Sequence, residues 1–170
     1  MAIRIIRTEE DPILRKTSRS VTKFDEKLGV ILDDMRETME KANGVGLAAV
    51  QVGLLRRIVV IDVGDGSGVL ELINPEIVEA DGEQEGQEGC LSLPDKWAIV
   101  KRPVHVRVRA QTRTGAWRRY EGEGLKARAC CHELDHLDGH LFIDRMEKML
   151  TEEEVRRLQS ERMNGKETDA

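Results

Sequence analysis

The pattern of apolar positions predicts three helices. Between residues 25 and 43, apolar side chains recur every three or four residues, which indicates an amphipathic helix, and Gly44 follows where it should end. A second stripe with this spacing runs from Ala127 to Leu141, with Gly139 as the expected C-terminal cap. A third segment, residues 151–163, is heavily charged, and we expect the tail after about residue 164 to be loose.

Shorter apolar runs predict strands in the middle of the chain. Residues 58–63 are typical of a buried strand, and a glycine-rich turn leads to a second run that Pro75 interrupts. Val104, Val106 and Val108 alternate with polar residues, as in a strand with one solvated face. Further strand-like segments are 69–73, 77–78 and 117–121. We therefore expect one α+β domain over residues 1–170, with mostly antiparallel sheets around a central helix and a C-terminal helix.

Composition narrows the class of protein. A chain of 170 residues with 39% hydrophobic content suffices for one core, which must be aliphatic because aromatic residues make up only 3%. The net charge of −5 argues against a nucleic acid as the main partner. Three cysteines, two of them adjacent, fit a reducing cytosol, and no apolar run reaches the length of a membrane span.

Six arginines gather on the strands predicted for the second half of the chain. The simplest interpretation is a solvated strand face, because charged side chains usually lie in water, and a binding patch is the alternative. These residues are Arg102, Arg107, Arg109, Arg113, Arg118 and Arg119.

The strongest chemical signal is residues 132–136, His-Glu-Leu-Asp-His, which have the pattern H-E-x-x-H. On a helix, positions i and i+4 share a face, so the imidazoles of His132 and His136 can bind one metal ion. Glu133 lies at the edge of that face, where it can act on water rather than on the metal. The central helix is therefore predicted to bind metal, and the pattern indicates hydrolysis by metal-activated water.

A catalytic metal needs a third protein ligand and an open position for water. His140 lies beyond Gly139, which should turn it out of line, and Phe142 occupies the position of a metzincin's third histidine. Downstream glutamates belong to the charged C-terminal segment: Glu147, Glu152, Glu153 and Glu154. Cys90 remains; it follows a glycine and opens a short strand-like run, and its thiolate would bind zinc or ferrous iron strongly. A small buried cysteine without a ligand role is the alternative.

Three segments in register resemble the motifs of the peptide deformylase family. Residues 44–51, Gly-Val-Gly-Leu-Ala-Ala-Val-Gln, are similar to G-x-G-L-A-A-x-Q. Residues 88–92 match E-G-C-L-S, and residues 132–139 match H-E-x-D-H-L-x-G. Weaker similarities extend the resemblance over residues 11–145, nearly the whole chain. Three motifs in the correct order are far more specific than H-E-x-x-H alone.

For the reaction, the resemblance implies hydrolysis of the formyl group on the N-terminal formylmethionine of new polypeptides, with formate as a product. The metal ligands would be Cys90, His132 and His136. Glu133 would move the proton, while the Gln51 side chain and the Leu91 backbone N–H would donate hydrogen bonds to the carbonyl oxygen as negative charge develops. The implied metal is ferrous iron, with zinc, nickel or cobalt as substitutes.

For the substrate, the resemblance implies that Gly46 lets its loop approach the peptide closely, because glycine has no side chain. The methionine side chain would enter an apolar pocket, and Val45, Cys131 and nearby leucines are candidates for its lining. The implied partners are N-formylmethionyl nascent chains in the bacterial cytoplasm. A ribosome contact through the arginines or the C-terminal helix stays open, and neither a membrane nor specific nucleic acid recognition is implied.

Two other classes of protein share part of this pattern. An endopeptidase could use the same H-E-x-x-H chemistry, but the motif at residues 44–51 and a cysteine ligand count against it. A non-catalytic zinc module would have four protein ligands, and only three are well placed here. We therefore expect a hydrolase.

Overall fold

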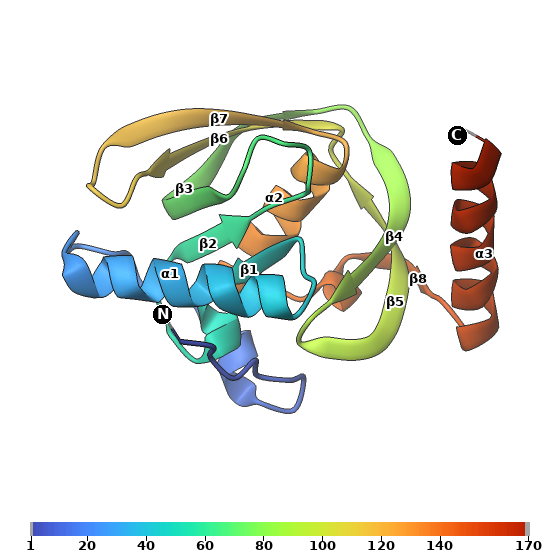
Figure 1. The fold of residues 1–170 in the computed structure, drawn as a ribbon, viewed down its shortest axis with the longest axis horizontal. Coiled ribbons are helices and arrows are strands. Elements are labelled where there is room, and N and C mark those ends of the chain that lie inside the picture. The colour runs from blue at the N-terminus through green and yellow to red at the C-terminus, as the bar shows by residue number, and fades with distance from the viewer. Residues whose placement is uncertain (1, 169–170) are drawn as a thin grey trace.

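Two antiparallel β-sheets enclose one helix at the centre of the protein (Figure 1). The computed structural model describes the backbone of residues 2–168 and the side chains of residues 2–161. Within this part of the chain, the α-helices are α1 (Glu26–Lys41), α2 (Leu125–Leu137) and α3 (Glu152–Thr168). The strands are β1 (Gly46–Ala48), β2 (Ile58–Ile61), β3 (Leu70–Asp81), β4 (Gln84–Cys90), β5 (Leu93–Arg102), β6 (His105–Gln111), β7 (Trp117–Glu123) and β8 (Met146–Met149). Short 3₁₀ helices are η1 (Pro12–Arg15), η2 (Ala49–Val52) and η3 (Phe142–Asp144).

The sheets differ in size and both contact α2. The larger has the strand order β1-β2-β3-β6-β7 and the smaller has the order β4-β5-β8, with antiparallel neighbours throughout. Helix α2 packs against β1, β2, β6 and β7 of the larger sheet and against β5 of the smaller one. The expected α+β architecture with antiparallel sheets is therefore confirmed, and the helix that carries residues 132–136 lies between the sheets.

The core that holds α2 in place is aliphatic, as the composition predicts. On β6, Val106, Val108 and Ala110 are buried at alternate positions. They belong to the same buried cluster as Leu134 and Leu137 of α2. Burying such a side chain typically contributes about 1.5–3 kcal/mol. The helix is thus fixed by packing on several sides, which allows polar side chains on its remaining face to be held in place.

Helix α1 forms where the periodicity predicts it. The Asp25 side chain caps its first turn by accepting a hydrogen bond from the Leu28 N–H at 3.2 Å. Asn43 has a left-handed conformation (φ 55°) just after the helix, and the Gly44 N–H returns to the Met39 carbonyl at 3.0 Å. A Cβ at Gly44 would lie 2.7 Å from Leu91 Cδ1, so a side chain there would require the end of Leu91 to shift.

The predicted interruption at Pro75 is wrong. Strand β3 is continuous through this proline, with a shift of register between Ile73 and Glu76. A bulge leaves a residue without a ladder hydrogen bond, so the missing proline N–H costs nothing there. Asn74, with φ 51°, instead uses its side-chain amide to donate to Gln111 Oε1 at 2.8 Å.

The smaller sheet was largely missed by the hydrophobic pattern. Cys90 ends β4 rather than opening a strand, and β4 reads Gln-Glu-Gly-Gln-Glu-Gly-Cys, without apolar alternation. It is a strand because it pairs with β5 from Gln84 to Cys90, and because its inward side chain Glu88 is buried with charged partners. Periodicity of apolar residues cannot detect such a strand.

Helix α3 stands apart from the two sheets in Figure 1. It continues to Thr168, so the expected loose tail after about residue 164 has helical backbone up to that residue. Residues 169 and 170 lie outside the described part of the chain. Among the described helices, none is long and apolar enough to cross a membrane.

Two half-buried members of the arginine cluster, Arg107 and Arg109, are paired with carboxylates on neighbouring strands. Arg107 lies 2.9 Å from Glu79 and 2.7 Å from Glu121, and Arg109 lies 3.2 Å from Glu76. The solvated face expected from the sequence therefore describes these residues, and their charge is largely compensated. For Arg102 that interpretation is wrong, because its side chain is only 4% exposed.

Candidate metal centre

Three side chains converge between β4 and α2. The Sγ atom of Cys90 lies 3.3 Å from Nε2 of His136, and one donor atom each from Cys90, His132 and His136 lies within 4.8 Å of the others. Tetrahedral zinc, with bonds of about 2.0–2.3 Å, places its ligand atoms about 3.5 Å apart. The spacing therefore suits a single ion, and the three residues expected as ligands come together although they lie far apart in the sequence.

Helix α2 presents both histidines on one face. Their rings lie 5.1 Å apart at an interplanar angle of 68°, and both side chains are buried. Burial lowers the pKa of His136 well below its usual value, so this imidazole is neutral, as a metal ligand must be. The helical spacing thus places both imidazoles on one face of α2, as expected for positions i and i+4.

Glu88 orients the first histidine from behind. Its Oε2 atom lies 2.9 Å from Nδ1 of His132, which leaves Nε2 of that ring for a metal. A carboxylate in this position fixes the ring and makes it a stronger ligand. Burial alone would raise the pKa of Glu88, but hydrogen bonds from His132 and Arg102 outweigh it and lower that pKa to about 2.

Two arginines compensate the buried charge of Glu88. Arg102 binds it through two hydrogen bonds, Nε to Oε1 at 2.7 Å and Nη2 to Oε2 at 3.0 Å, and Arg128 donates to Oε1 at 3.0 Å. Arg102 also donates to Asp135 on α2 at 2.8 Å. The network therefore joins β4, β5 and α2 directly behind His132.

Sequence reasoning missed this network, although a signal was present. Glu88 and Cys90 are two residues apart on one strand, and side chains at i and i+2 point to the same face. A carboxylate on the face of a metal-binding cysteine is a candidate partner for a ligand histidine. The roles of Arg102 and Arg128 could not be predicted, because they come from other elements.

Glu133 lies beside the three converging side chains in a buried environment. Its side chain is buried, Oε1 is 3.7 Å from Nε2 of His132, and Oε2 has no hydrogen-bond partner among the described residues. Burial raises the pKa of Glu133 to about 7, within the range that suits proton transfer near neutral pH. A Cβ at Gly46 would lie 3.1 Å from Oε1, so this glycine borders the carboxyl group.

Gln51 reaches the same place from η2. Its Oε1 accepts a hydrogen bond from the Ala48 N–H at 2.9 Å, and its Nε2 faces Ser92 Oγ at 3.1 Å and Cys90 Sγ at 3.5 Å. The side-chain amide therefore lies next to the cysteine. The family resemblance implies a place for Gln51 near the reacting carbonyl, but it gave no role to Ser92.

Leu91 and Val45 lie at the edge of the site. Leu91 follows Cys90 directly in the β4–β5 turn, so its N–H is close to the cysteine, and its side chain contacts Gly44. Val45 precedes Gly46 and is 43% exposed, which leaves an apolar side chain available to a ligand. The motif at residues 44–51 therefore borders the site through several of its residues.

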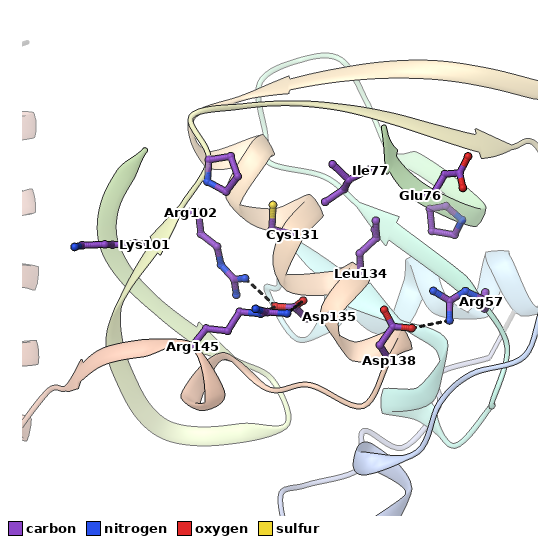
Figure 2. A pocket seen from close by; sticks show the side chains of 12 residues that line it. Arg57, Glu76, Ile77, Lys101, Arg102, Cys131, Leu134, Asp135, Asp138 and Arg145 are labelled. Atoms are coloured by element: carbon purple, nitrogen blue, oxygen red, sulfur yellow. Dashed lines mark hydrogen bonds and ion pairs between the residues drawn. The ribbon is translucent and has the colours of Figure 1, made fainter. Parts of the chain in front are cut away.

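A separate cavity of about 470 Å³ lies on another face of α2 (Figure 2). Cys131, Leu134, Asp135 and Asp138 line it from the helix, and none of the three expected metal ligands contributes to its lining. Figure 2 shows Arg102 reaching Asp135 across this cavity. Cys131 lines this cavity and Val45 does not, so this cavity does not bring the two residues expected to line the methionine pocket together.

The rejected candidates for a third ligand lie elsewhere. The Glu147 carboxylate is 3.9 Å from Lys101, and Glu154 pairs with Lys148 at 2.9 Å, both at the surface. Helix α2 ends at Leu137 and Gly139 follows with φ 78°, so His140 lies outside the helix that aligns His132 and His136. Among the described residues, the only His, Cys, Asp and Glu group with donor spacing for a metal is the one at Cys90.

Comparisons with known proteins agree with this geometry. A family model described as polypeptide deformylase matches residues 3–152. The chain is 55% identical over 160 residues to a peptide deformylase of Caldicellulosiruptor bescii, covering 94% of this chain and 95% of that one. It is 56% identical over 150 residues to a peptide deformylase of Agathobacter rectalis, covering 88% and 94%.

Solved structures show the same similarity. The crystal structure of peptide deformylase from Thermotoga maritima matches with a TM-score of 0.84 and 44% identity, covering 87% of this chain and all of that one (100%). A structure of class I type b peptide deformylase from Acinetobacter baumannii with Met-Ala-Ser bound matches with a TM-score of 0.82 and 30% identity, covering 85% and 99%.

Proposed function

We propose specific roles for the site residues of this chain, which belongs to the peptide deformylase family. Members of this family are metalloenzymes that remove the N-formyl group from nascent polypeptides. In this assignment Cys90, His132 and His136 hold the metal ion. The observation that carries it is the convergence of these three donors within 4.8 Å beside the buried carboxyl group of Glu133.

The bound divalent ion would supply a Lewis acid, which polarises a carbonyl group and lowers the pKa of water. Glu133 would take a proton from the attacking water and pass it to the leaving nitrogen, so that the C–N bond breaks to give formate and a free amine. Burial raises the pKa of this carboxyl group, which favours its uptake of a proton. Glu133 is close enough to His132 to reach a water at the ligand face, yet it remains outside the group of donors.

Gln51 and Leu91 would stabilise the carbonyl oxygen during the attack. The Gln51 Nε2 group lies 3.5 Å from Cys90 Sγ. The Leu91 N–H is beside Cys90 because Leu91 follows it directly in the chain. Fixed donors of this kind are most effective where water is excluded, and Gln51 is only 1% exposed.

The substrate we propose is an N-formylmethionyl nascent chain in the bacterial cytoplasm. The relative from Acinetobacter baumannii binds Met-Ala-Ser, the peptide that remains when formyl-Met-Ala-Ser loses its formyl group. In this chain, Val45 and Gly46 border the site from the β1 side, so we assign them to the substrate. We place the encounter with the substrate at the ribosome, where nascent chains emerge.

We propose ferrous iron as the native metal, with zinc, nickel and cobalt as substitutes. A Cys-His-His donor set suits ferrous iron and zinc alike, and an iron–thiolate site would be sensitive to oxygen. Metal analysis after anaerobic purification should find iron, with activity lost on exposure to air. Zinc as the only metal, together with activity unchanged in air, would contradict this assignment.

The ligand assignment is tested by two cysteine variants. Cys90→Ala should lose metal and formate release together, whereas Cys131→Ala, whose sulfur lines the separate cavity, should keep both. Glu133→Gln should keep its metal but lose about 10²–10⁴ in kcat, the usual contribution of a general acid–base group. Metal retained by Cys90→Ala, or less than a tenfold change in Glu133→Gln, would overturn the respective role.

A further inference from the structure

The side-chain amide of Gln51 is held at both ends. Its oxygen accepts the hydrogen bond from the Ala48 N–H at 2.9 Å, which decides which end of the amide is nitrogen. The nitrogen carries two protons. Ser92 Oγ lies 3.1 Å away as a good acceptor for one of them, and Cys90 Sγ lies 3.5 Å away as a poor acceptor for the other.

Burial makes the Ser92 contact hard to replace. Gln51 is 1% exposed and Ser92 is fully buried at 0% exposure, so water cannot easily take the place of the serine hydroxyl. A buried donor without an acceptor is costly. If the serine hydroxyl were absent, the amide nitrogen would keep, among the described residues, only its contact with the cysteine sulfur, and the amide would rotate to improve that contact.

We propose that Ser92 is a positioning residue for the deformylation reaction. By accepting one Nε2 proton, Ser92 turns the other proton of Gln51 toward Cys90, where the carbonyl oxygen of the substrate would be bound. The inference rests on the proposed role of Gln51 as a donor to that oxygen. Ser92 itself contacts neither the substrate nor the metal in this proposal.

The first test is kinetic. Ser92→Ala should lower kcat about three- to tenfold, the effect of one hydrogen bond, with KM and metal content unchanged. In a Gln51→Ala background the same substitution should change kcat by less than twofold, because Ser92 acts through Gln51. An equal loss in both backgrounds, or a change confined to KM, would overturn the proposal.

A matched control separates this effect from general damage. Ser18 is also a buried serine, 4% exposed, but its hydroxyl has no hydrogen-bond partner among the described residues. Ser18→Ala should therefore leave kcat unchanged. Ser92→Thr, which keeps the hydroxyl, should recover most of the activity that Ser92→Ala loses; equal losses in the two Ser92 variants would show that the hydroxyl is not what matters.

A second readout does not depend on turnover. In NMR spectra of zinc-loaded wild-type protein, the two Nε2 protons of Gln51 can be assigned by comparison with Gln51→Ala. Their rates of exchange with solvent should differ, and one of them should exchange slowly. Ser92→Ala should abolish that protection. Two equally fast protons in the wild type would overturn the proposal even if the alanine variant failed to fold. Unchanged kcat in Gln51→Ala would instead refute the role of Gln51, and the inference with it.

Discussion

Gly46 lies directly against Glu133: a Cβ atom at Gly46 would be 2.8 Å from Glu133 Cγ and 3.0 Å from Cδ. Real Cβ atoms essentially never approach so closely, so a side chain at this position would push the carboxyl group away from the ligand face. The resemblance to the peptide deformylase family implies that Gly46 lets its loop approach the substrate closely. The contact gives a second reason for glycine at this position, because it leaves room for the carboxyl group of Glu133, the proposed general base.

The first prediction follows from this contact. Gly46→Ala should displace Glu133 and lower kcat roughly 10–100-fold while leaving the metal bound, since small misplacements of a catalytic group are costly. Gly29→Ala is the matched control, because a Cβ there would meet only Arg113 Nη1 at an ordinary 3.7 Å. Steady-state kinetics with metal analysis distinguish the outcomes; equal kcat in the two variants would refute the positioning role.

The second prediction concerns the carboxylate behind His132. Glu88→Gln should weaken metal binding by roughly 10–100-fold, as loss of a ligand's hydrogen-bond partner typically does. It should also destabilise the fold, by less than the about 3–5 kcal/mol of a fully uncompensated buried charge, because Arg128 loses its carboxylate partner while Arg102 keeps Asp135. Competition with a chelator and urea unfolding measure the two effects.

Its control is a glutamate in an exposed pair. Glu76 has a side chain that is 57% exposed and lies 3.2 Å from Arg109. Such pairs contribute about 0–1 kcal/mol, so Glu76→Gln should leave both properties nearly unchanged. Metal affinity equal to the wild type in Glu88→Gln would show that His132 needs no support from this carboxylate.

How far the sequence predicts this protein depends on the kind of element. The helix at residues 25–43 and the central helix were predicted because their apolar stripes face a core. Strand β4 was not, since its buried residue Glu88 is charged and its partners lie on β5 and α2. Pro75 was misread because a bulge cannot be seen in a local pattern.

The candidate site divides in the same way. His132 and His136 followed from helical spacing, and Cys90 from the chemistry of thiolates and a family motif. Glu88 and Ser92 act through neighbours that are distant in the sequence, so their contacts appear only once the chain is folded. The burial of Arg102 could not be predicted for the same reason, because sequence alone does not distinguish a buried arginine from an exposed one.

The third prediction uses the three cysteine thiols. Burial raises the pKa of Cys130 to about 12 and that of Cys131 to about 11, so neither should react with an aromatic disulfide reagent at pH 8. In metal-loaded protein Cys90 should also be protected. Chelation should therefore release one reactive thiol, and the Cys90→Ala variant should show none. A reactive thiol in that variant would contradict the burial of the helix cysteines.

The fourth prediction is a pH dependence in protein stripped of metal. There burial raises the pKa of Glu133 from 4.5 to about 7, so the native state binds this proton more tightly than the unfolded state does. The resulting stabilisation is complete below pH 4.5 and is lost as the pH rises through about 7. Glu133→Gln lacks this ionisation, so its stability relative to the wild type should rise over that window by roughly 3 kcal/mol at most. Urea unfolding at pH 5 and pH 7.5 measures the change, and a constant difference would contradict it.

The last prediction concerns selectivity for the formyl group. The proposed donors Gln51 and Leu91 lie beside Cys90, and Gly46 packs against Glu133 on the β1 side, so we expect little room around the reacting carbon. A formyl carbon carries only hydrogen, so it can enter where an acetyl methyl group or a peptide chain would collide. Attack on a formyl group is also intrinsically easier than attack on a substituted amide.

Formyl-Met-Ala-Ser should therefore release formate, while acetyl-Met-Ala-Ser and the internal bonds of a longer unblocked peptide should stay intact. Steric exclusion of the larger groups adds to the difference in reactivity, because specificity depends on what a site rejects as well as on what it binds. All three peptides need the same metal-loaded preparation, with Glu133→Gln as the inactive control. Equal turnover of the acetyl peptide would remove the steric argument. Internal cleavage without formate release would favour the endopeptidase, since that enzyme would use the same histidines and glutamate on a peptide bond.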